Sequence, residues 1–378
     1  MTTQATPDRD TPDGDIPDGD TPDGDTPDGA GYRSPLLDLP GAVAAEGVDA
    51  GTAWHYGDPG REQRYLEEGL GVVDLSHRGV VTVTGPDRLT WLHSLTTQHL
   101  SELAAGTSVE AMVLSPHGHV EHVLHVVDDG VTTWLTVEPG TAGPLVAWLD
   151  RMRFLSRVEV ADVSRQWAVV GEARSASAAP GEPPVWVDPW PRTAPGSAAY
   201  GVPDDRHVGR ARPWREVLVP RADLAAEVVD RPPVGTWAAE AVRVAAARPR
   251  HLFETDHRTI PHEADWLRSA VHLAKGCYRG QETVARVHNL GRPPRRLALL
   301  HLDGSDHALP PRGAAVRRAD DPAAAVGFVT TVARHAELGP VALALLKRKV
   351  PGDAGLAVDA GPGGGRPVAA SQDTLGLA

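Results

Sequence analysis

The sequence predicts an α+β fold in which a ferredoxin-like layer is followed by a small C-terminal β-barrel. Two β-branched segments, 120–127 and 131–137, flank an Asp-Asp-Gly turn at 128–130, which is typical of a hairpin. A helical segment at 144–153 and then a further strand segment follow, and this order indicates an α+β layer. After residue 291, short strand-like segments alternate with turns rich in Gly, Pro and Asp, and they indicate the barrel.

The individual elements follow from apolar spacing, capping residues and β-branched runs. Helices are expected where apolar residues recur at helical spacing or where caps frame an Ala-rich run, at 86–98, 144–153 and 237–247. Strands are expected at 79–84, 120–127, 131–137, 166–170, 216–220, 295–302, 314–317, 325–332 and 340–347. Residues 173–200, rich in Ala, Pro, Gly and Ser, are predicted to form a long surface connection.

Composition divides the chain into four parts. Residues 1–35 are predicted to be a disordered acidic tail, because the five-residue repeat at 6–30 has almost no apolar side chains and repels itself. Residues 36–290 are expected to form the main domain, built from two intertwined subdomains. Residues 291–350 are expected to form the barrel domain, and the Gly-rich residues 351–378 a loose tail.

Charge and cysteine content exclude several classes of protein. Of the net charge of −13, residues 1–30 contribute nine Asp and one Arg, and the remaining mildly acidic body argues against direct nucleic-acid binding. No stretch approaches the roughly 18 apolar residues of a membrane span, and the acidic N-terminus does not resemble a signal peptide, so a cytoplasmic location is expected. The single cysteine excludes an internal disulfide and a self-contained iron–sulfur or Cys-rich zinc site.

That cysteine, Cys277, lies in the octapeptide Lys-Gly-Cys-Tyr-Arg-Gly-Gln-Glu at 275–282. A short helix is expected to begin near Gly280, which places Cys277 just before a helix N-terminus with Lys275 and Arg279 on either side. Helix N-terminal amides and neighbouring cations both favour a thiolate, so the local sequence indicates a reactive sulfur. The residues alone are also compatible with a small buried hydrophobic side chain, which is the commoner role of a free cysteine.

The octapeptide resembles the signature of the YgfZ-type proteins, which are relatives of the glycine-cleavage T-protein in the aminomethyltransferase-like superfamily. Further segments resemble the superfamily in the same order, so that the resemblance runs from about residue 60 to 350. They are Val-Asp-Leu-Ser-His-Arg-Gly at 73–79, Val-Thr-Gly-Pro-Asp at 83–87, Ala-Val-Arg-Val at 241–244, Ile-Pro-His-Glu at 260–263, Val-Ala-Arg-Val-His at 284–288 and Arg-Arg-Leu at 295–297.

The resemblance implies three subdomains around a central hole that holds tetrahydrofolate. It also implies a role in maintaining iron–sulfur enzymes, including enzymes that modify tRNA, so folate and iron–sulfur client or assembly proteins are the expected partners. Cys277, flanked by Lys275 and Arg279, is the expected functional residue. The side chains expected to contact folate are Glu216, Arg243, Tyr278, Gln281 and Glu282.

Three of these assignments have structural alternatives. Glu216 suits the pterin edge, because a carboxylate accepts two parallel N–H bonds, but it also fits a strand-edge surface position. Arg243 fits either a folate contact or a structural ion pair. Glu282 is equally well explained by its position in the first turn of a helix.

The T-protein branch, which transfers a one-carbon unit to folate, places an Asp pair on a strand after a Gly. Here His122 and Val123 occupy those positions, so the carboxylate that should hold the folate amine is missing or displaced to Glu121. This argues against aminomethyltransferase activity and leaves open whether any reaction is catalysed. A tetrahydrofolate-dependent aminomethyltransferase and a non-catalytic folate-binding scaffold remain the alternatives.

Four histidines cluster at positions 117, 119, 122 and 125. Such spacing suits zinc or iron, but strand alternation places 117, 119 and 125 on one side and 122 on the other. No metal site is therefore predicted.

Overall fold

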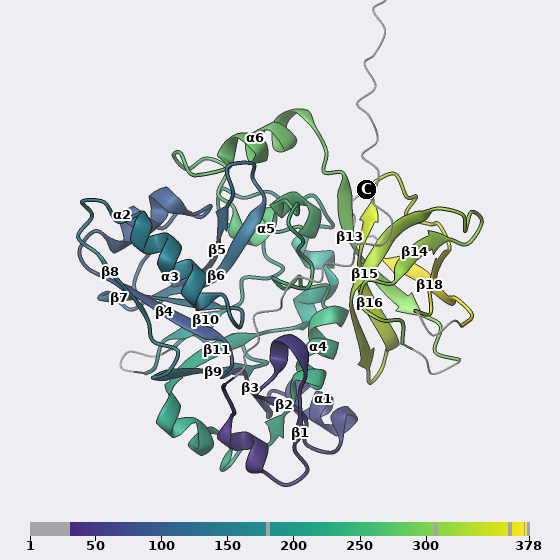
Figure 1. The fold of residues 1–378 in the computed structure, drawn as a ribbon, viewed down its shortest axis with the longest axis horizontal. Coiled ribbons are helices and arrows are strands. Elements are labelled where there is room, and N and C mark those ends of the chain that lie inside the picture. The colour runs from purple at the N-terminus through teal and green to yellow at the C-terminus, as the bar shows by residue number, and fades with distance from the viewer. Residues whose placement is uncertain (1–30, 179–181, 306–308, 362–364, 374, 376–378) are drawn as a thin grey trace, which may run out of the picture.

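The computed structural model describes residues 31–178, 182–305, 309–361, 365–373 and 375, so the acidic repeat at 6–30 lies outside the described residues. Two five-stranded sheets lie on one side of the molecule and a closed barrel on the other, with helix α4 (Thr236–Ala245) between them (Figure 1). The predicted α+β class with a C-terminal barrel is confirmed. No helix among the described residues has the length and apolar character that a membrane crossing requires.

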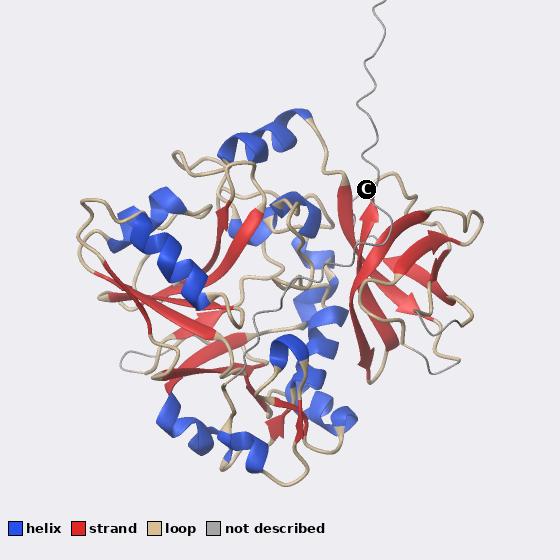
Figure 2. Cartoon of the chain, viewed as in Figure 1, coloured by secondary structure: helices blue, strands red, loops and turns tan. Residues whose placement is uncertain are grey.

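The first sheet is antiparallel and carries two helices on one face (Figure 2). Its strands, in spatial order, are β5 (Ser108–Leu114), β6 (Val120–Asp128), β7 (Thr132–Val137), β4 (Gly79–Thr84) and β8 (Glu159–Asp162). The helices are α2 (Arg88–Leu95) and α3 (Ala142–Arg151), both within a few residues of their predicted bounds. Leu92 and Leu145 pack with Val81 and Val113 into one core, which is the face that the apolar spacing of the helices predicts.

The second sheet is mainly antiparallel, and its strand order is β10, β11, β9, β3 and β12. Their bounds are β3 Val72–Asp74, β9 Trp167–Glu172, β10 Val185–Val187, β11 Arg215–Pro220 and β12 Pro233–Val234. The prediction of a long surface connection over 173–200 is wrong at β10. Its central residue Trp186 is fully buried and pairs with Glu216 of β11. The Pro and Gly residues around it favour a loop, so the local sequence did not indicate a strand.

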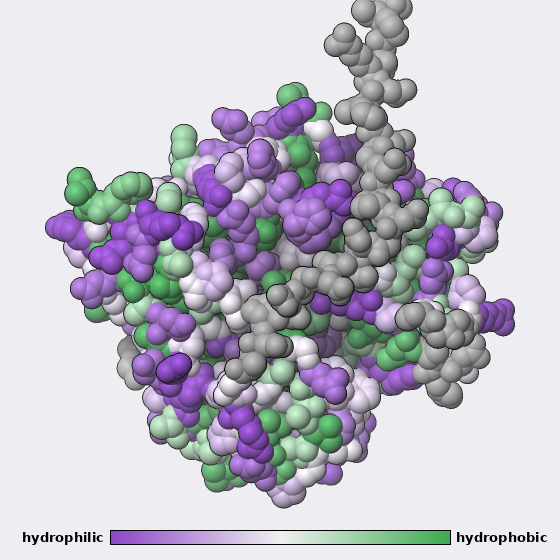
Figure 3. Space-filling view, viewed as in Figure 1, coloured by the Kyte–Doolittle hydropathy of each residue, from purple (hydrophilic) through white to green (hydrophobic). Residues whose placement is uncertain are grey.

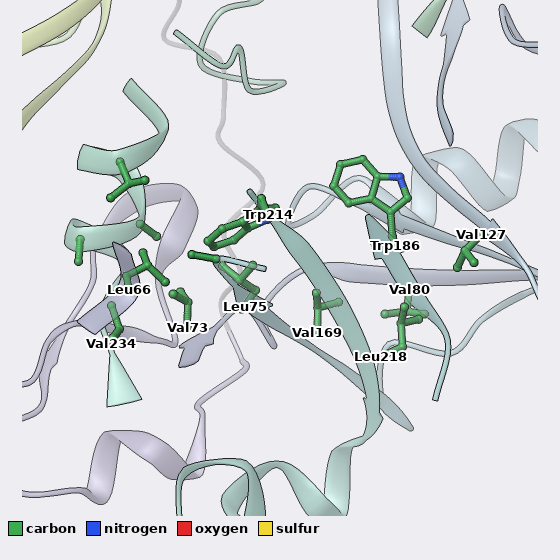
Figure 4. Close-up of a cluster of buried hydrophobic side chains, with 14 of the residues drawn as sticks. Leu66, Val73, Leu75, Val80, Val127, Val169, Trp186, Trp214, Leu218 and Val234 are labelled. Carbon is green, nitrogen blue, oxygen red and sulfur yellow. The ribbon is translucent and has the colours of Figure 1, made fainter. Parts of the chain in front are cut away.

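One hydrophobic core joins the two sheets (Figure 4). Val80 and Val127 come from the first sheet, whereas Val73 and Val169 come from the second. Helix α1 (Pro59–Glu67) contributes Leu66 to the same core. Two short strands, β1 (Val43–Ala44) and β2 (Ala53–His55), form a separate ribbon nearby.

The barrel closes in the order β13, β16, β15, β14, β17, β18. Its strands are β13 Arg295–Leu302, β14 Ala315–Arg318, β15 Ala325–His335, β16 Gly339–Lys347, β17 Leu356–Val358 and β18 Val368–Asp373. The expected loose tail from residue 351 is therefore wrong, because β17 and β18 complete the barrel. Val358, Val368 and Ala370 point into its core, but runs this short between glycines give too weak a pattern to predict a strand.

Two further helices lie on the other face of the first sheet, α5 (Leu267–Ala270) and α6 (Gln281–Leu290). Leu267 and Val284 pack there against Met112 and Val123. Helix α6 begins where the sequence predicts, directly after Gly280, whose φ of +80° suits glycine. Polar and apolar residues are interspersed over the face of the molecule seen in Figure 3.

Candidate functional site

A central cavity lies between the two sheets and helix α4. It encloses about 700 Å³, including the part that is open to solvent. Its walls are unusually rich in buried charge, and they include six carboxylates and five guanidinium groups: Asp49, Glu110, Glu138, Asp188, Glu216, Glu240, Arg78, Arg212, Arg243, Arg248 and Arg250. Trp186, Trp214 and Trp266 add aromatic surface. Polar groups that converge on a partly enclosed space are typical of a small-molecule site.

Glu216 lies on β11 with its side chain 1% exposed, so the surface alternative for this residue is wrong. Oε1 accepts a hydrogen bond from Arg78 Nη1 at 2.5 Å, and Oε2 lies 2.9 Å from His125 Nδ1. Burial raises the pKa of the Glu216 carboxyl, but the charges of Arg78 and His125 outweigh it and hold that pKa well below its usual range. Glu216 is therefore a buried anion with Arg78 on one oxygen and His125 on the other.

Arg243, on α4, connects the cavity to the barrel. Its guanidinium donates to Glu240 at 2.8 and 2.9 Å, to Glu254 at 2.8 Å and to Thr331 of β15 at 3.1 Å. Arg243 thus lines the cavity and forms a structural ion pair at the same time, because its planar fork reaches several acceptors at once.

Sequence reasoning missed Arg250, which joins the largest group of cavity charges. Its guanidinium lies 2.7 Å from Asp49, 2.8 Å from Glu138 and 3.2 Å from Glu240. Burial raises the pKa of Glu138, but the positive charges of Arg250 and Arg78 have the larger effect and lower that pKa to about 2. The usable signal in the sequence was the Arg-Pro-Arg triplet at 248–250, which directly follows the Ala-rich helix.

Three lining side chains keep a buried N–H group without a partner among the described residues: Arg78 Nε, Arg212 Nε and Trp266 Nε1. Buried donors without partners are costly and rare in proteins. A bound molecule that offers oxygen acceptors would satisfy them, and the carbonyl and carboxylate groups of a folate fit this requirement.

Cys277 is exposed and is not among the residues that line the cavity. The alternative that Cys277 is a small buried hydrophobic side chain is therefore wrong. Its loop is anchored by Lys275, whose Nζ donates to the carbonyl oxygens of His93 and Thr96 at the C-terminal end of α2. Burial lowers the pKa of Lys275 to about 8. The loop is thus fixed to α2 by a cation at a helix C-terminus, an arrangement that the helix dipole favours.

Arg279 pairs with Glu121 of β6, at 2.7 Å between Nη1 and Oε2. Lys275 and Arg279 therefore each have an oxygen partner of their own. The ion pair also places Glu121 outside the cavity wall, whereas Val123 of the same strand lines it.

The remaining predicted residues surround the Cys277 loop rather than the cavity. Tyr278 is buried, with Lys275 Nζ 4.9 Å from its ring centroid, and Gln281 and Glu282 begin α6. The structure therefore divides the predicted residues into two groups. Glu216 and Arg243 line the cavity, while Lys275, Cys277, Tyr278, Arg279, Gln281 and Glu282 lie outside its lining.

The clustered histidines are divided as well. His117 and His119 precede β6, which begins at Val120, so the predicted strand alternation does not apply to them. His125 stacks on Trp186 at 3.7 Å between ring centroids, and burial lowers the pKa of His122 to about 4. Within the described part of the chain, no group of three or more His, Cys, Asp or Glu side chains is arranged to hold a metal ion.

Replacing Gly280 by alanine is expected to lower the free energy of unfolding by about 1–3 kcal/mol. An added Cβ would meet the Ser115 carbonyl oxygen at 2.5 Å, and φ is +80°. Urea unfolding measures the loss, and hydrogen exchange should show faster opening of the 275–282 loop. Gly276→Ala is the matched control, since nothing lies within 4 Å of its Cβ. Equal stability of both variants would contradict a tightly held loop.

Comparisons with known proteins agree with this architecture. Residues 39–171 match the model of the GCVT N-terminal domain. A chloroplast protein of Arabidopsis thaliana, classed provisionally as a transferase, is 28% identical over 253 residues, which are 63% of this chain and 57% of that protein. The aminomethyltransferase of Symbiobacterium thermophilum is 27% identical over 79% of this chain and 84% of its own length.

The alignment with the plant protein thus spans little more than half of that protein's length. Among solved structures, the aminomethyltransferase T of the glycine cleavage system from Bartonella henselae superposes with a TM-score of 0.71. It shares 18% identity and covers 91% of this chain and 96% of the other, which establishes a common fold. Residues 39–171 are thus similar to the GCVT N-terminal domain, and the chain has an aminomethyltransferase-like fold.

Proposed function

We propose that the protein binds tetrahydrofolate in the central cavity and acts through Cys277 as a cytoplasmic accessory factor for the assembly or maintenance of iron–sulfur proteins, including enzymes that modify tRNA. The observation that carries the proposal is the position of the sulfur. Cys277 is exposed on a loop that Lys275 anchors, outside the lining of the cavity. A small ligand inside and a protein partner outside can therefore be bound at the same time.

The walls of the cavity support a binding role more than an aminomethyl transfer. At the place of the carboxylate pair of the transferase branch, Val123 faces the cavity and Glu121 is held by Arg279. Glu216 remains as a buried carboxylate, and its partners Arg78 and His125 hold it in the ionised form. We therefore expect the lining residues to bind a folate, whereas each carboxylate that the structure describes in the lining is already paired with an arginine.

The alternative is a tetrahydrofolate-dependent aminomethyltransferase of the T-protein type, the activity named for several relatives. It predicts turnover when the protein is incubated with tetrahydrofolate and an aminomethyl-lipoyl carrier protein. We expect none, and measurable formation of methylenetetrahydrofolate would favour the transferase instead.

Titration with tetrahydrofolate should show micromolar binding, on the order of −8 kcal/mol. Glu216→Gln is expected to weaken this binding at least tenfold, because the pterin loses a charged acceptor. The matched control is Glu172→Gln, which changes a carboxylate that is equally buried but pairs with Arg215 and Arg231 outside the cavity. Wild-type protein that fails to bind tetrahydrofolate at millimolar concentration would refute the folate assignment.

Cys277→Ala is expected to abolish support of an iron–sulfur enzyme in cells while leaving folate affinity within twofold of the wild type, because the sulfur lies outside the cavity lining. Activity of a tRNA-modifying iron–sulfur enzyme in a strain that lacks the native gene is the readout. Full support by the alanine variant, with folate binding intact, would favour a non-catalytic folate-binding scaffold.

A further inference from the structure

We propose that Arg212 and Trp266 form a carboxylate subsite in the central cavity, and that this subsite selects ligands independently of Glu216. The subsite rests on the proposed function, because it concerns a ligand of the same cavity. It adds a chemical requirement, since a ligand with a pterin edge alone would leave the subsite empty.

Arg212 is the first element of the subsite. Its side chain is 7% exposed. The guanidinium lies over the ring of Trp214, with 4.5 Å between the guanidinium carbon and the ring centroid. Nη1 lies 3.3 Å from Asp188 Oδ2, while Nε is buried and has no partner among the described residues. A buried guanidinium in the lining of the cavity thus keeps an unused donor.

The other arginines of the cavity are better compensated. Arg248 takes the same Asp188 oxygen at 3.1 Å and also binds Glu110 at 2.8 Å, so Arg212 shares its counter-ion with a stronger competitor. Arg243 and Arg250 each bind two or more carboxylates. Burial, with Arg248 and Arg243 nearby, lowers the pKa of Arg212 to about 10, a shift that an additional anion would reverse.

Trp266 is the second element. It is fully buried, directly precedes α5 and lines the cavity, and its indole N–H has no partner. Among the described residues of the cavity lining, the buried side-chain atoms without a partner are all donors, whereas the six lining carboxylates all have arginine partners. The cavity is short of acceptors, so an acceptor-rich ligand complements it.

A carboxylate matches the subsite better than a phosphate does. The Nε edge of a guanidinium offers parallel N–H bonds to a planar carboxylate. Asp188 and Glu110 lie close by and would repel a dianion more strongly than a single negative charge. The expected ligand thus combines an aromatic or pterin ring with a carboxylate.

Three probes separate the two halves of such a ligand: tetrahydrofolate, 6-methyltetrahydropterin, which has no carboxylate, and 4-aminobenzoyl-glutamate, which has no pterin. Isothermal titration should show that tetrahydrofolate binds at least tenfold more tightly than the methylpterin. Arg212→Gln is expected to reduce the affinity for both carboxylate probes at least tenfold and to leave the methylpterin within twofold. Arg212→Lys should recover part of the loss, because it restores the charge without the planar fork.

Two further variants distinguish loss of the subsite from a general loss of folding. Trp266→Phe removes the unpartnered donor without changing charge, and it should weaken the carboxylate probes alone while the thermal midpoint stays at or above that of the wild type. Arg215→Gln is the control, since Arg215 is ion-paired with Glu172 and does not line the cavity.

The outcomes separate the subsite from the folate proposal. Tetrahydrofolate binding that is unchanged in Arg212→Gln would overturn the subsite and leave the folate assignment intact. If neither pterin probe binds but 4-aminobenzoyl-glutamate binds in an Arg212-dependent manner, the subsite stands and the folate assignment fails. Absence of binding by all three probes overturns both.

Discussion

Replacing Arg250 by methionine is expected to lower the free energy of unfolding by about 3–5 kcal/mol. The guanidinium is 5% exposed and lies between Asp49, Glu138 and Glu240. Methionine keeps most of the aliphatic stem but removes the charge, so three buried carboxylates lose a common partner. Uncompensated buried charge is among the most destabilising changes a single substitution makes.

Chemical denaturation of the variant and the wild type measures this loss directly. Arg318→Met is the control, because Arg318 pairs with Asp320 at the surface and its removal should leave the unfolding transition unchanged. A loss below about 1 kcal/mol for Arg250→Met would show that the cavity carboxylates take up protons or reorganise at little cost.

Acidification from pH 6.5 to pH 4 is expected to reduce stability by more than about 3 kcal/mol. Burial is the main cause that lowers the pKa of four histidines to about 4 in the folded protein, namely His122, His207, His251 and His262. The unfolded chain binds these protons near pH 6.5 and the folded protein does not. Their stabilisation is therefore complete above pH 6.5 and is lost as the pH falls through the folded pKa.

Other groups do not account for this pH window. The pKa of Glu138 is lowered from 4.5 to about 2 in the folded protein, so most of its contribution is lost below pH 4. Asp265 acts in the opposite sense, because burial raises its pKa to about 6 and its contribution is lost as the pH rises. Unfolding free energies measured at several pH values test the prediction, and His251→Gln should flatten the slope. A flat profile between pH 4 and 6.5 would contradict it.

How far the sequence predicts this molecule depends on whether a feature is local. The helix after Gly280 and the barrel strand that begins at Arg295 were predictable, because their caps and apolar patterns lie within a few residues. Strand β10 was not, because Trp186 is buried only by its partners on β11 and by the first sheet. Strands β17 and β18 were not predicted from the sequence for the same reason, because they form only when the barrel closes.

The same distinction applies to the site. The octapeptide indicated a reactive sulfur at Cys277, which the structure shows to be exposed. The resemblance pointed to Glu216 and Arg243, both of which line the cavity. The partners of those residues could not be read from spacing. Arg250 meets Asp49 and Glu138 only after folding, and neither carboxylate lies in a recognisable motif. A network of buried charge leaves little trace in sequence, because each member resembles an ordinary surface residue.

The pairing of β13 with β18 also has a consequence during synthesis. Strand β13 begins the barrel, but one of its edges is completed only by residues 368–373. While the chain is still being translated, that edge has no partner, whereas the two sheets beside the central cavity, complete by β12, can already form. The barrel thus assembles after the two sheets, and a ribosome that stalls before residue 373 would leave an open sheet edge that is prone to aggregation.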